Sequence, residues 1–314
     1  MLLNFLLLAG CFAMPQDMPS TASPVTAAVF SADGREVIVG SQAGISALSW
    51  PAMTQKRMIA TSLDNIHDLQ LTADGEMLLI AGGTPGESGA IQMVTLSTGV
   101  TRQNIEVGAD VILRLGQMRD GKTVIAVGAE SVCAVCDLQT GQILSRFAGH
   151  SGSVMAVQPL ADTLVASAGV DQTIRLWNPM SGQLQRTLNN HVDAINDLAV
   201  QDSSAEASEN GNTLPLLAST ADDRTVRLWQ PRNGRLLRFR KLPSIARTMV
   251  FSPEGTKLVL GCDDGQIRIL DVMGLQILGE KRSDCGRIFV IVRSSNPDEI
   301  FVGGSLGASR ISLK

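Results

Sequence analysis

Two groups of residues in this chain have the composition of a hydrolase's nucleophile, base and acid. They are His150, Ser167 and Asp171, and His191, Ser219 and Asp223. A serine activated by a histidine that a carboxylate orients is a nucleophile for acyl transfer. Such a serine must be open to substrate, yet both serines lie in the middle of short apolar runs that are typical of buried strands. We therefore expect structural rather than catalytic roles for both groups.

The segments that carry these residues recur along the 314-residue chain. A third-strand position recurs at Trp50, Val94, Cys136, Trp177, Trp229, Leu270 and Ser312. The steps between these positions are 41 to 44 residues, except for one of 52 that contains the polar insertion 201–212. Turns such as SADGR and TADGE separate the first and second strands of each unit, and Asp-Gly supplies the positive φ that a tight hairpin needs. The period predicts seven units of four short antiparallel strands.

A four-stranded unit of this size cannot bury both of its faces alone. Seven such units bury their faces by stacking on one another, and a ring is the closed way to do so. The sequence therefore predicts an all-β fold, a seven-bladed β-propeller of four-stranded antiparallel blades. No run of 11 or more residues keeps a helical period.

Three short motifs resemble the signature of the WD-repeat (WD40) family. They are the Gly-His pair at 149–150, DQTIRLW at 171–177 and DDRTVRLW at 222–229. The resemblance implies a single propeller over residues 13–314. Because the last unit ends in its third strand, it also implies that residues 13–21 supply the closing strand of the last blade.

The same resemblance implies a role for each member of the two groups. In the family, a histidine, a serine, an aspartate and a tryptophan form one buried hydrogen-bond chain in each well-formed blade. The matching residues here are His150, Ser167, Asp171 and Trp177 in blade four, and His191, Ser219, Asp223 and Trp229 in blade five. Exposed residues beside the turn aspartates often contact partners, which implies such a role for Val170, Asp222 and Asp263.

The function that the resemblance implies is a non-catalytic scaffold for protein–protein interaction, without a cofactor and with a monomeric ring. The alternative is an exported propeller enzyme or redox accessory with a site in the central channel. The first strands that should line this channel carry His67, Asp68, Arg114, Asp197 and Arg247. This set includes two arginines and only a few side chains that can bind a metal ion, so it does not indicate a metal site.

The pair Cys133 and Cys136 has C-x-x-C spacing, which could indicate a redox pair or half of a zinc site. On a strand, residues three apart point to opposite faces. We therefore expect the two thiols to pack in the core.

Acidic and basic residues are nearly equal in number over the whole chain, but the basic residues are concentrated in one segment. The net charge of −4 makes nucleic acid an improbable partner, yet residues 224–247 contain eight basic residues and no acidic one. The densest part, which includes Arg235, Arg238, Arg240 and Lys241, should form an outer edge strand. Basic residues on an edge prevent edge-to-edge pairing, and they could equally bind an anionic partner surface.

The N-terminal segment, residues 1–12, is apolar and too short to span a bilayer. It is similar to the core of a signal peptide, and LLAGC at 7–11 is similar to a bacterial lipobox, although no basic residue precedes it. The expectation is therefore an extracytoplasmic or lipid-anchored protein that meets a membrane only through this segment. The alternative is a cytoplasmic protein.

Overall fold

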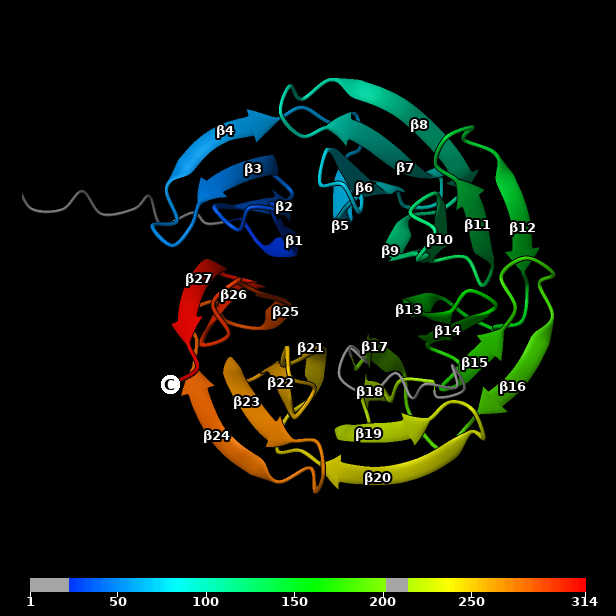
Figure 1. Cartoon of the computed structure of the whole chain (residues 1–314), viewed down its shortest axis with the longest axis vertical. Coiled ribbons are helices and arrows are strands. Elements are labelled where there is room, and N and C mark those ends of the chain that lie inside the picture. The colour runs from blue at the N-terminus through cyan, green and yellow to red at the C-terminus, as the bar shows by residue number, and fades with distance from the viewer. Residues whose placement is uncertain (1–22, 202–213) are drawn as a thin grey trace, which may run out of the picture.

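The computed structural model describes residues 23–201 and 214–314. In these residues the chain forms strands and no helix, arranged as seven blades around a central axis (Figure 1). The predicted propeller is therefore confirmed. The signal-like segment 1–12, the proposed closing strand 13–21 and all but the first residue of the insertion 201–212 lie outside the described residues. In the described parts, no helix is long and apolar enough to cross a membrane.

The first four blades contain four antiparallel strands each, in sequence order. Blade one comprises β1 (Val25–Phe30), β2 (Glu36–Ser41), β3 (Gly44–Ser49) and β4 (Gln55–Ile59). Blade two comprises β5 (Asn65–Leu71), β6 (Met77–Thr84), β7 (Ser88–Thr95) and β8 (Thr101–Gly108). Blade three comprises β9 (Ile112–Gln117), β10 (Thr123–Gly128), β11 (Cys133–Asp137) and β12 (Ile143–Phe147). Blade four comprises β13 (Val154–Ala161), β14 (Leu164–Gly169), β15 (Ile174–Trp177) and β16 (Leu184–Leu188).

The remaining blades continue around the ring. Blade five comprises β17 (Ile195–Val200), β18 (Leu217–Ala221), β19 (Thr225–Gln230) and β20 (Arg235–Lys241). Blade six comprises β21 (Ala246–Phe251), β22 (Lys257–Cys262), β23 (Gln266–Asp271) and β24 (Ile277–Arg282). Blade seven has three strands in the described residues, β25 (Ile288–Arg293), β26 (Glu299–Gly304) and β27 (Gly307–Ser312). The first strand of each blade faces the centre and the last lies at the rim (Figure 1).

The hydrophobic core lies between blades rather than within one. One cluster joins Val135 and Phe147 of blade three to Val165 and Trp177 of blade four. Another joins blade one to blade seven through residues such as Val37 and Phe301, so the ring closes by packing. Each blade therefore depends on its neighbours for burial of its apolar faces.

The pairing register corrects two positions of the sequence repeat. Trp177 pairs with Val165, which in turn pairs with the sixth residue of its blade's first strand. In blade one the residue at the same point of the register is Leu48, not Trp50, which lies after β3. In blade seven the corresponding residue is Ile311, not Ser312. The tryptophan at position 50 was therefore the wrong marker for the third strand of blade one.

Antiparallel connections divide the loops between two faces of the ring. The turns between second and third strands, and the links from each fourth strand to the next blade, lie on one face, which we call the link face. The turns between first and second strands lie on the opposite face. The turn aspartates Asp171 and Asp223 and the histidines His150 and His191 are all in loops of the link face.

Candidate functional site

A buried hydrogen-bond chain runs through blade four. The Trp177 Nε1–H donates to Ser167 Oγ at 3.0 Å, and Ser167 Oγ lies 2.8 Å from His150 Nε2. His150 Nδ1 lies 2.9 Å from Asp171 Oδ2. Because the serine accepts from the tryptophan, its own hydroxyl proton is free to bond Nε2, which leaves the Nδ1–H to donate to the carboxylate. One tautomer satisfies every member of the chain.

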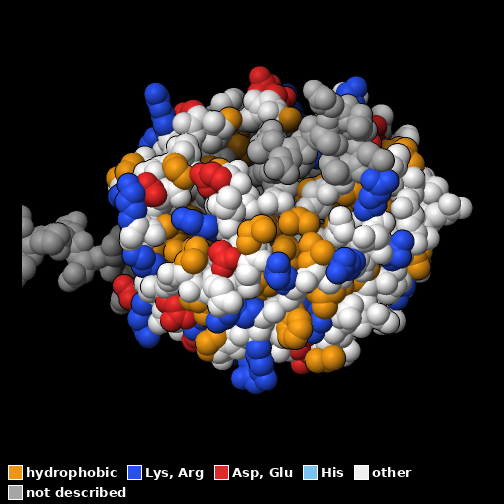
Figure 2. Space-filling model, turned by 60° about the horizontal axis from the view of Figure 1, so that its bottom comes forward, with side chains coloured by type: hydrophobic (Ala, Val, Ile, Leu, Met, Phe, Trp, Pro, Cys, Tyr) orange, Lys and Arg blue, Asp and Glu red, His pale blue; other side chains and the backbone are white. Residues whose placement is uncertain are grey.

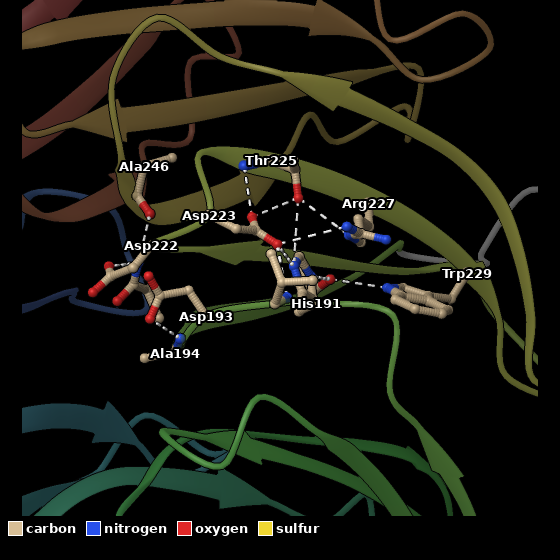
Figure 3. Close-up of polar contacts among 12 residues, drawn as sticks. His191, Asp193, Ala194, Asp222, Asp223, Thr225, Arg227, Trp229 and Ala246 are labelled. Carbon is tan, nitrogen blue, oxygen red and sulfur yellow. Dashed lines mark hydrogen bonds and ion pairs between the residues drawn. The ribbon is translucent and has the colours of Figure 1, made fainter.

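Blade five repeats this arrangement (Figure 3). Trp229 Nε1–H donates to Ser219 Oγ at 2.9 Å, His191 Nε2 lies 2.7 Å from that oxygen, and His191 Nδ1 lies 2.7 Å from Asp223 Oδ2. The Thr225 hydroxyl donates to the other carboxylate oxygen at 2.7 Å. The structure thus brings together all four residues that the sequence groups in each blade.

The Ser-His-Asp contacts match those of a catalytic triad, so burial decides between the two interpretations. Ser167 and Ser219 have no exposed surface, and each accepts the N–H of a fully buried tryptophan. A substrate carbonyl therefore has no approach to either oxygen. Burial also lowers the pKa of His150 and His191, although the partner aspartates act in the opposite direction, so both imidazoles are neutral at pH 7.

The residues beside the turn aspartates differ in what they offer to a partner. Val170 is 43% exposed. Asp222 and Asp263 are instead held by Arg247, whose Nη1–H donates to Asp222 Oδ1 at 2.7 Å and whose Nη2–H donates to Asp263 Oδ2 at 2.9 Å. Asn196 donates to the same Asp222 oxygen at 2.9 Å. These groups form a cross-linked cluster between blades five and six.

The central channel contains a cavity of about 1260 Å³ that is lined by the first strands. Asp68, Arg114 and Asp197 line it. His67 and Arg247, which also lie on first strands, do not, because not every side chain of a first strand faces inward. Both occupy a β-bulge, where the register shifts between positions 66 and 68 and between 246 and 248. A bulge residue leaves the regular alternation of the strand, and the Arg247 side chain bonds Asp222 and Asp263 instead.

The two channel carboxylates connect neighbouring blades. Asp68 Oδ2 accepts the backbone N–H of Leu115 at 2.8 Å, and Asp197 Oδ2 accepts that of Met249 at 2.9 Å. In each case the other carboxylate oxygen accepts the next N–H of its own strand. In the part of the chain that the structure describes, no three His, Cys, Asp or Glu side chains are placed to hold a metal ion.

Burial of Asp197 gives a pH dependence that can be measured. Desolvation raises the pKa of this carboxyl from 3.8 to about 6. The folded state then binds more protons than the unfolded state between these two pH values, so this group's contribution to stability is present below about 4 and is lost as the pH rises to about 6. We expect the free energy of unfolding of Asp197→Asn, relative to wild type, to increase over this interval.

The two proteins share every other titrating group, including His150 and His191, so the difference between them isolates Asp197. Urea titrations at several pH values between 4 and 7 would measure it. Parallel profiles for the two proteins would contradict the burial of a proton-binding carboxyl at this position.

Cys133 and Cys136 lie on opposite sides of β11. Cys133 packs in the cluster between blades three and four, and Cys136 in the cluster between blades two and three. Desolvation raises the pKa of the Cys133 thiol to about 12 and that of the Cys136 thiol to about 11. Both groups are therefore thiols at neutral pH, and they are free rather than disulfide-bonded.

Blade six has a buried polar centre that the sequence motifs do not predict. Arg268 pairs with Leu260 as Arg175 and Arg227 pair with the serines of blades four and five. Its side chain is only 4% exposed, and it donates to Asp264 at 2.6 Å and to Glu280 at 2.8 Å. The buried Leu242 stands where those blades have histidine, four residues before the first strand. The arginine therefore replaces the histidine as the partner of the turn aspartate.

The basic residues of 235–241 lie on β20, the outer edge strand of blade five, as expected. Arg235, Arg238 and Lys241 are exposed, whereas Arg240 is half-buried and donates to Gln276 at 3.1 Å.

Comparison with known proteins agrees with this geometry. The family model "WD domain, G-beta repeat" matches residues 141–178 and 182–230. The chain is 25% identical over 244 residues to rat apoptotic protease-activating factor 1, covering 71% of this chain and 18% of that protein. It is 24% identical to Protein ROOT INITIATION DEFECTIVE 3 of Arabidopsis thaliana, covering 62% and 46%.

A third relative is GID complex subunit 7 of Schizosaccharomyces pombe, 28% identical over 54% of this chain and 33% of that protein. These relatives are eukaryotic, and the chain spans less than half the length of each of them. The matched repeats coincide with the two blades that carry the Trp-Ser-His-Asp chains, and they lie within a ring of seven blades. The chain therefore contains WD repeats in blades four and five and has the fold of a seven-bladed β-propeller.

Proposed function

We propose that the protein is a non-catalytic platform that binds a protein partner through its link face. Relatives include a GID complex subunit, whose name places that protein in an assembly. The observation that carries the proposal is the contrast between satisfied and exposed groups in blades four and five. The Ser, His and Asp side chains that could do chemistry are buried and bonded to one another, while apolar side chains beside them are exposed.

Two exposed valines mark the contact surface on the link face. Val170 follows β14 and is 43% exposed, and Val192 follows His191 and is 74% exposed. The N–H of Val192 donates to Asp223 Oδ2 at 3.3 Å, and Val170 directly precedes Asp171, which His150 holds at 2.9 Å. The exposed Asp193 adds negative charge next to Val192. A rigid loop that presents an apolar side chain beside a charge is suited to partner binding.

The test compares two double variants of the tagged protein. Val170→Glu/Val192→Glu changes the link face. Leu144→Glu/Met273→Glu is the control, because those residues are 43% and 77% exposed. Leu144 lies on the outer strand β12, and Met273 lies in a turn between third and fourth strands, on the opposite face. We expect quantitative mass spectrometry after affinity capture to show partners reduced about tenfold by the first pair, corresponding to roughly 1.4 kcal/mol, and retained by the control. Equal capture by both double variants would contradict a contact at these valines.

We also propose that residues 1–12 direct export or lipid attachment. The support is the apolar segment with LLAGC at its end. Mass spectrometry of the mature N-terminus tests this proposal. A chain that begins at a lipid-modified Cys11 supports it, and an intact, unmodified Met1 in the fractionated cytoplasm refutes it.

A further inference from the structure

Strand β20 carries four positive charges that nothing in the described residues neutralises. It contains Arg235, Arg238, Arg240 and Lys241 and no acidic residue. No carboxylate of the described residues lies within 4.0 Å of these side chains, although nearby Arg227, Arg247 and Arg268 each have an acidic partner. The outer strands of blades one to four and six carry at most two basic residues each. Among these described outer strands, the concentration of unpaired charge is particular to blade five.

Exposed apolar side chains lie among these charges. Phe239 is 61% exposed and Leu237 is 37% exposed. The guanidinium of Arg227 lies 5.4 Å from the centre of the Phe239 ring, which holds the ring at the surface by a cation–π contact. Figure 2, which turns the lower rim of Figure 1 forward, shows hydrophobic side chains interleaved with Lys and Arg on this side of the molecule.

The backbone of β20 is open along one side. It pairs with β19 and with no other strand in the described parts of the chain. Its seven residues span about 23 Å, enough to pair with a peptide of similar length. Arg238 and Arg240 face one side of the sheet, opposite Leu228 and Val226, while Phe239 and Lys241 face the other, opposite Arg227 and Thr225.

We propose that the outer edge of β20 binds an extended acidic segment of a partner protein as an added strand. Acidic side chains of that segment lie beside Arg238 and Arg240, and apolar ones lie beside Phe239. Peptides commonly bind exposed sheet edges in this way, with main-chain hydrogen bonds for affinity and alternate side chains for specificity. The site is separate from the link face, so this proposal does not depend on the proposed function, and each can be tested without the other.

Charge selects this occupant over two others. A second copy of β20 would bring four positive charges against four, which opposes edge-to-edge pairing. Single-stranded nucleic acid favours several aromatic side chains for base stacking, and β20 offers only Phe239. An acidic strand satisfies both the unpaired cations and the open backbone.

A fluorescent seven-residue peptide that alternates glutamate with valine is the probe. We expect fluorescence anisotropy to detect saturable binding to the full chain that weakens as salt is raised. The Arg238→Glu/Arg240→Glu variant should bind at least tenfold more weakly. The control Lys122→Glu/Arg282→Glu makes the same charge change on blades three and six and should bind within twofold of wild type. Circular dichroism confirms that both variants are folded.

Two modified peptides test the mode of binding. A peptide with lysine in place of glutamate and one with N-methylated backbone should each lose binding, and amide hydrogen exchange should slow in 235–241 when the unmodified peptide is bound. The proposal is overturned if the glutamate peptide does not bind, if Arg238→Glu/Arg240→Glu leaves its affinity unchanged, or if N-methylation has no effect. Tighter binding of an oligodeoxythymidine than of the peptide, lost in the same variant, would replace the acidic segment with nucleic acid.

Discussion

Trp177→Ala should lower the free energy of unfolding by about 3–5 kcal/mol, the largest single effect we expect in this chain. The indole is fully buried and stacks on Phe147 of blade three, with ring centres 4.7 Å apart. Its removal leaves a cavity between two blades and takes away the N–H that Ser167 accepts. Urea titration followed by circular dichroism measures the change.

Trp50→Ala is the matched control, because it removes the same side chain from a position outside the third strand. Trp50 is half-buried, and its ring and that of Phe30 are nearly perpendicular, with their centres 4.9 Å apart. Its removal should cost about 1–2 kcal/mol. A loss for Trp177→Ala below about 1 kcal/mol, or one no larger than that of Trp50→Ala, would contradict the role of Trp177 between the blades.

Arg268→Ala is the second large effect, with an expected loss of about 2–3 kcal/mol. Removing one partner of a fully buried ion pair costs roughly 3–5 kcal/mol, but solvent reaches Asp264 and Glu280, whose side chains are 36% and 45% exposed, and reduces the loss. The loss comes from the two charge-assisted contacts and from the packing of the side-chain stem in blade six.

The comparison variant is Arg175→Ala, at the corresponding position of blade four. In blade four, His150 Nδ1 already lies 2.9 Å from Oδ2 of the turn aspartate, Asp171. Arg175 Nη2 lies 3.7 Å from the same oxygen, and the Arg175 side chain is 18% exposed. We expect a loss below about 1 kcal/mol for this variant. Similar losses for the two variants in thermal or urea unfolding would show that Arg268 does not replace the histidine of the other blades.

The sequence was sufficient for the number of blades because the repeat is long, regular and marked by turns. Blades four and five could also be assigned residue by residue, since Trp177 and Trp229 stand at the same point of the pairing register. Trp50 is misleading because its residue type matches the third-strand tryptophans of blades four and five, whereas the hydrogen-bond register defines the position and selects Leu48. A periodic pattern does not reveal a register error of two residues when both residues are apolar.

Side chains at irregular points of the backbone were harder to place. The bulge on β21 turns Arg247 away from the channel toward Asp222 and Asp263, and an alternation of two cannot predict a bulge. Arg268 is unpredicted for a different reason. The family signature describes blades that contain the histidine. In blade six a buried leucine, Leu242, occupies the histidine position, and Arg268 bonds the turn aspartate instead. The available signal was an arginine, Arg268, four residues after the turn aspartate Asp264 in a blade that lacks the histidine.

Site-specific photo-crosslinking can show whether a protein partner contacts the link face. A photoreactive amino acid replaces Val192 in one protein and Met273 in another, since these residues are 74% and 77% exposed, and both proteins are irradiated in their native cells. We expect a discrete protein adduct from position 192 and none of comparable yield from position 273. An adduct from position 273 alone, or none from position 192, would contradict a partner-binding platform on this face.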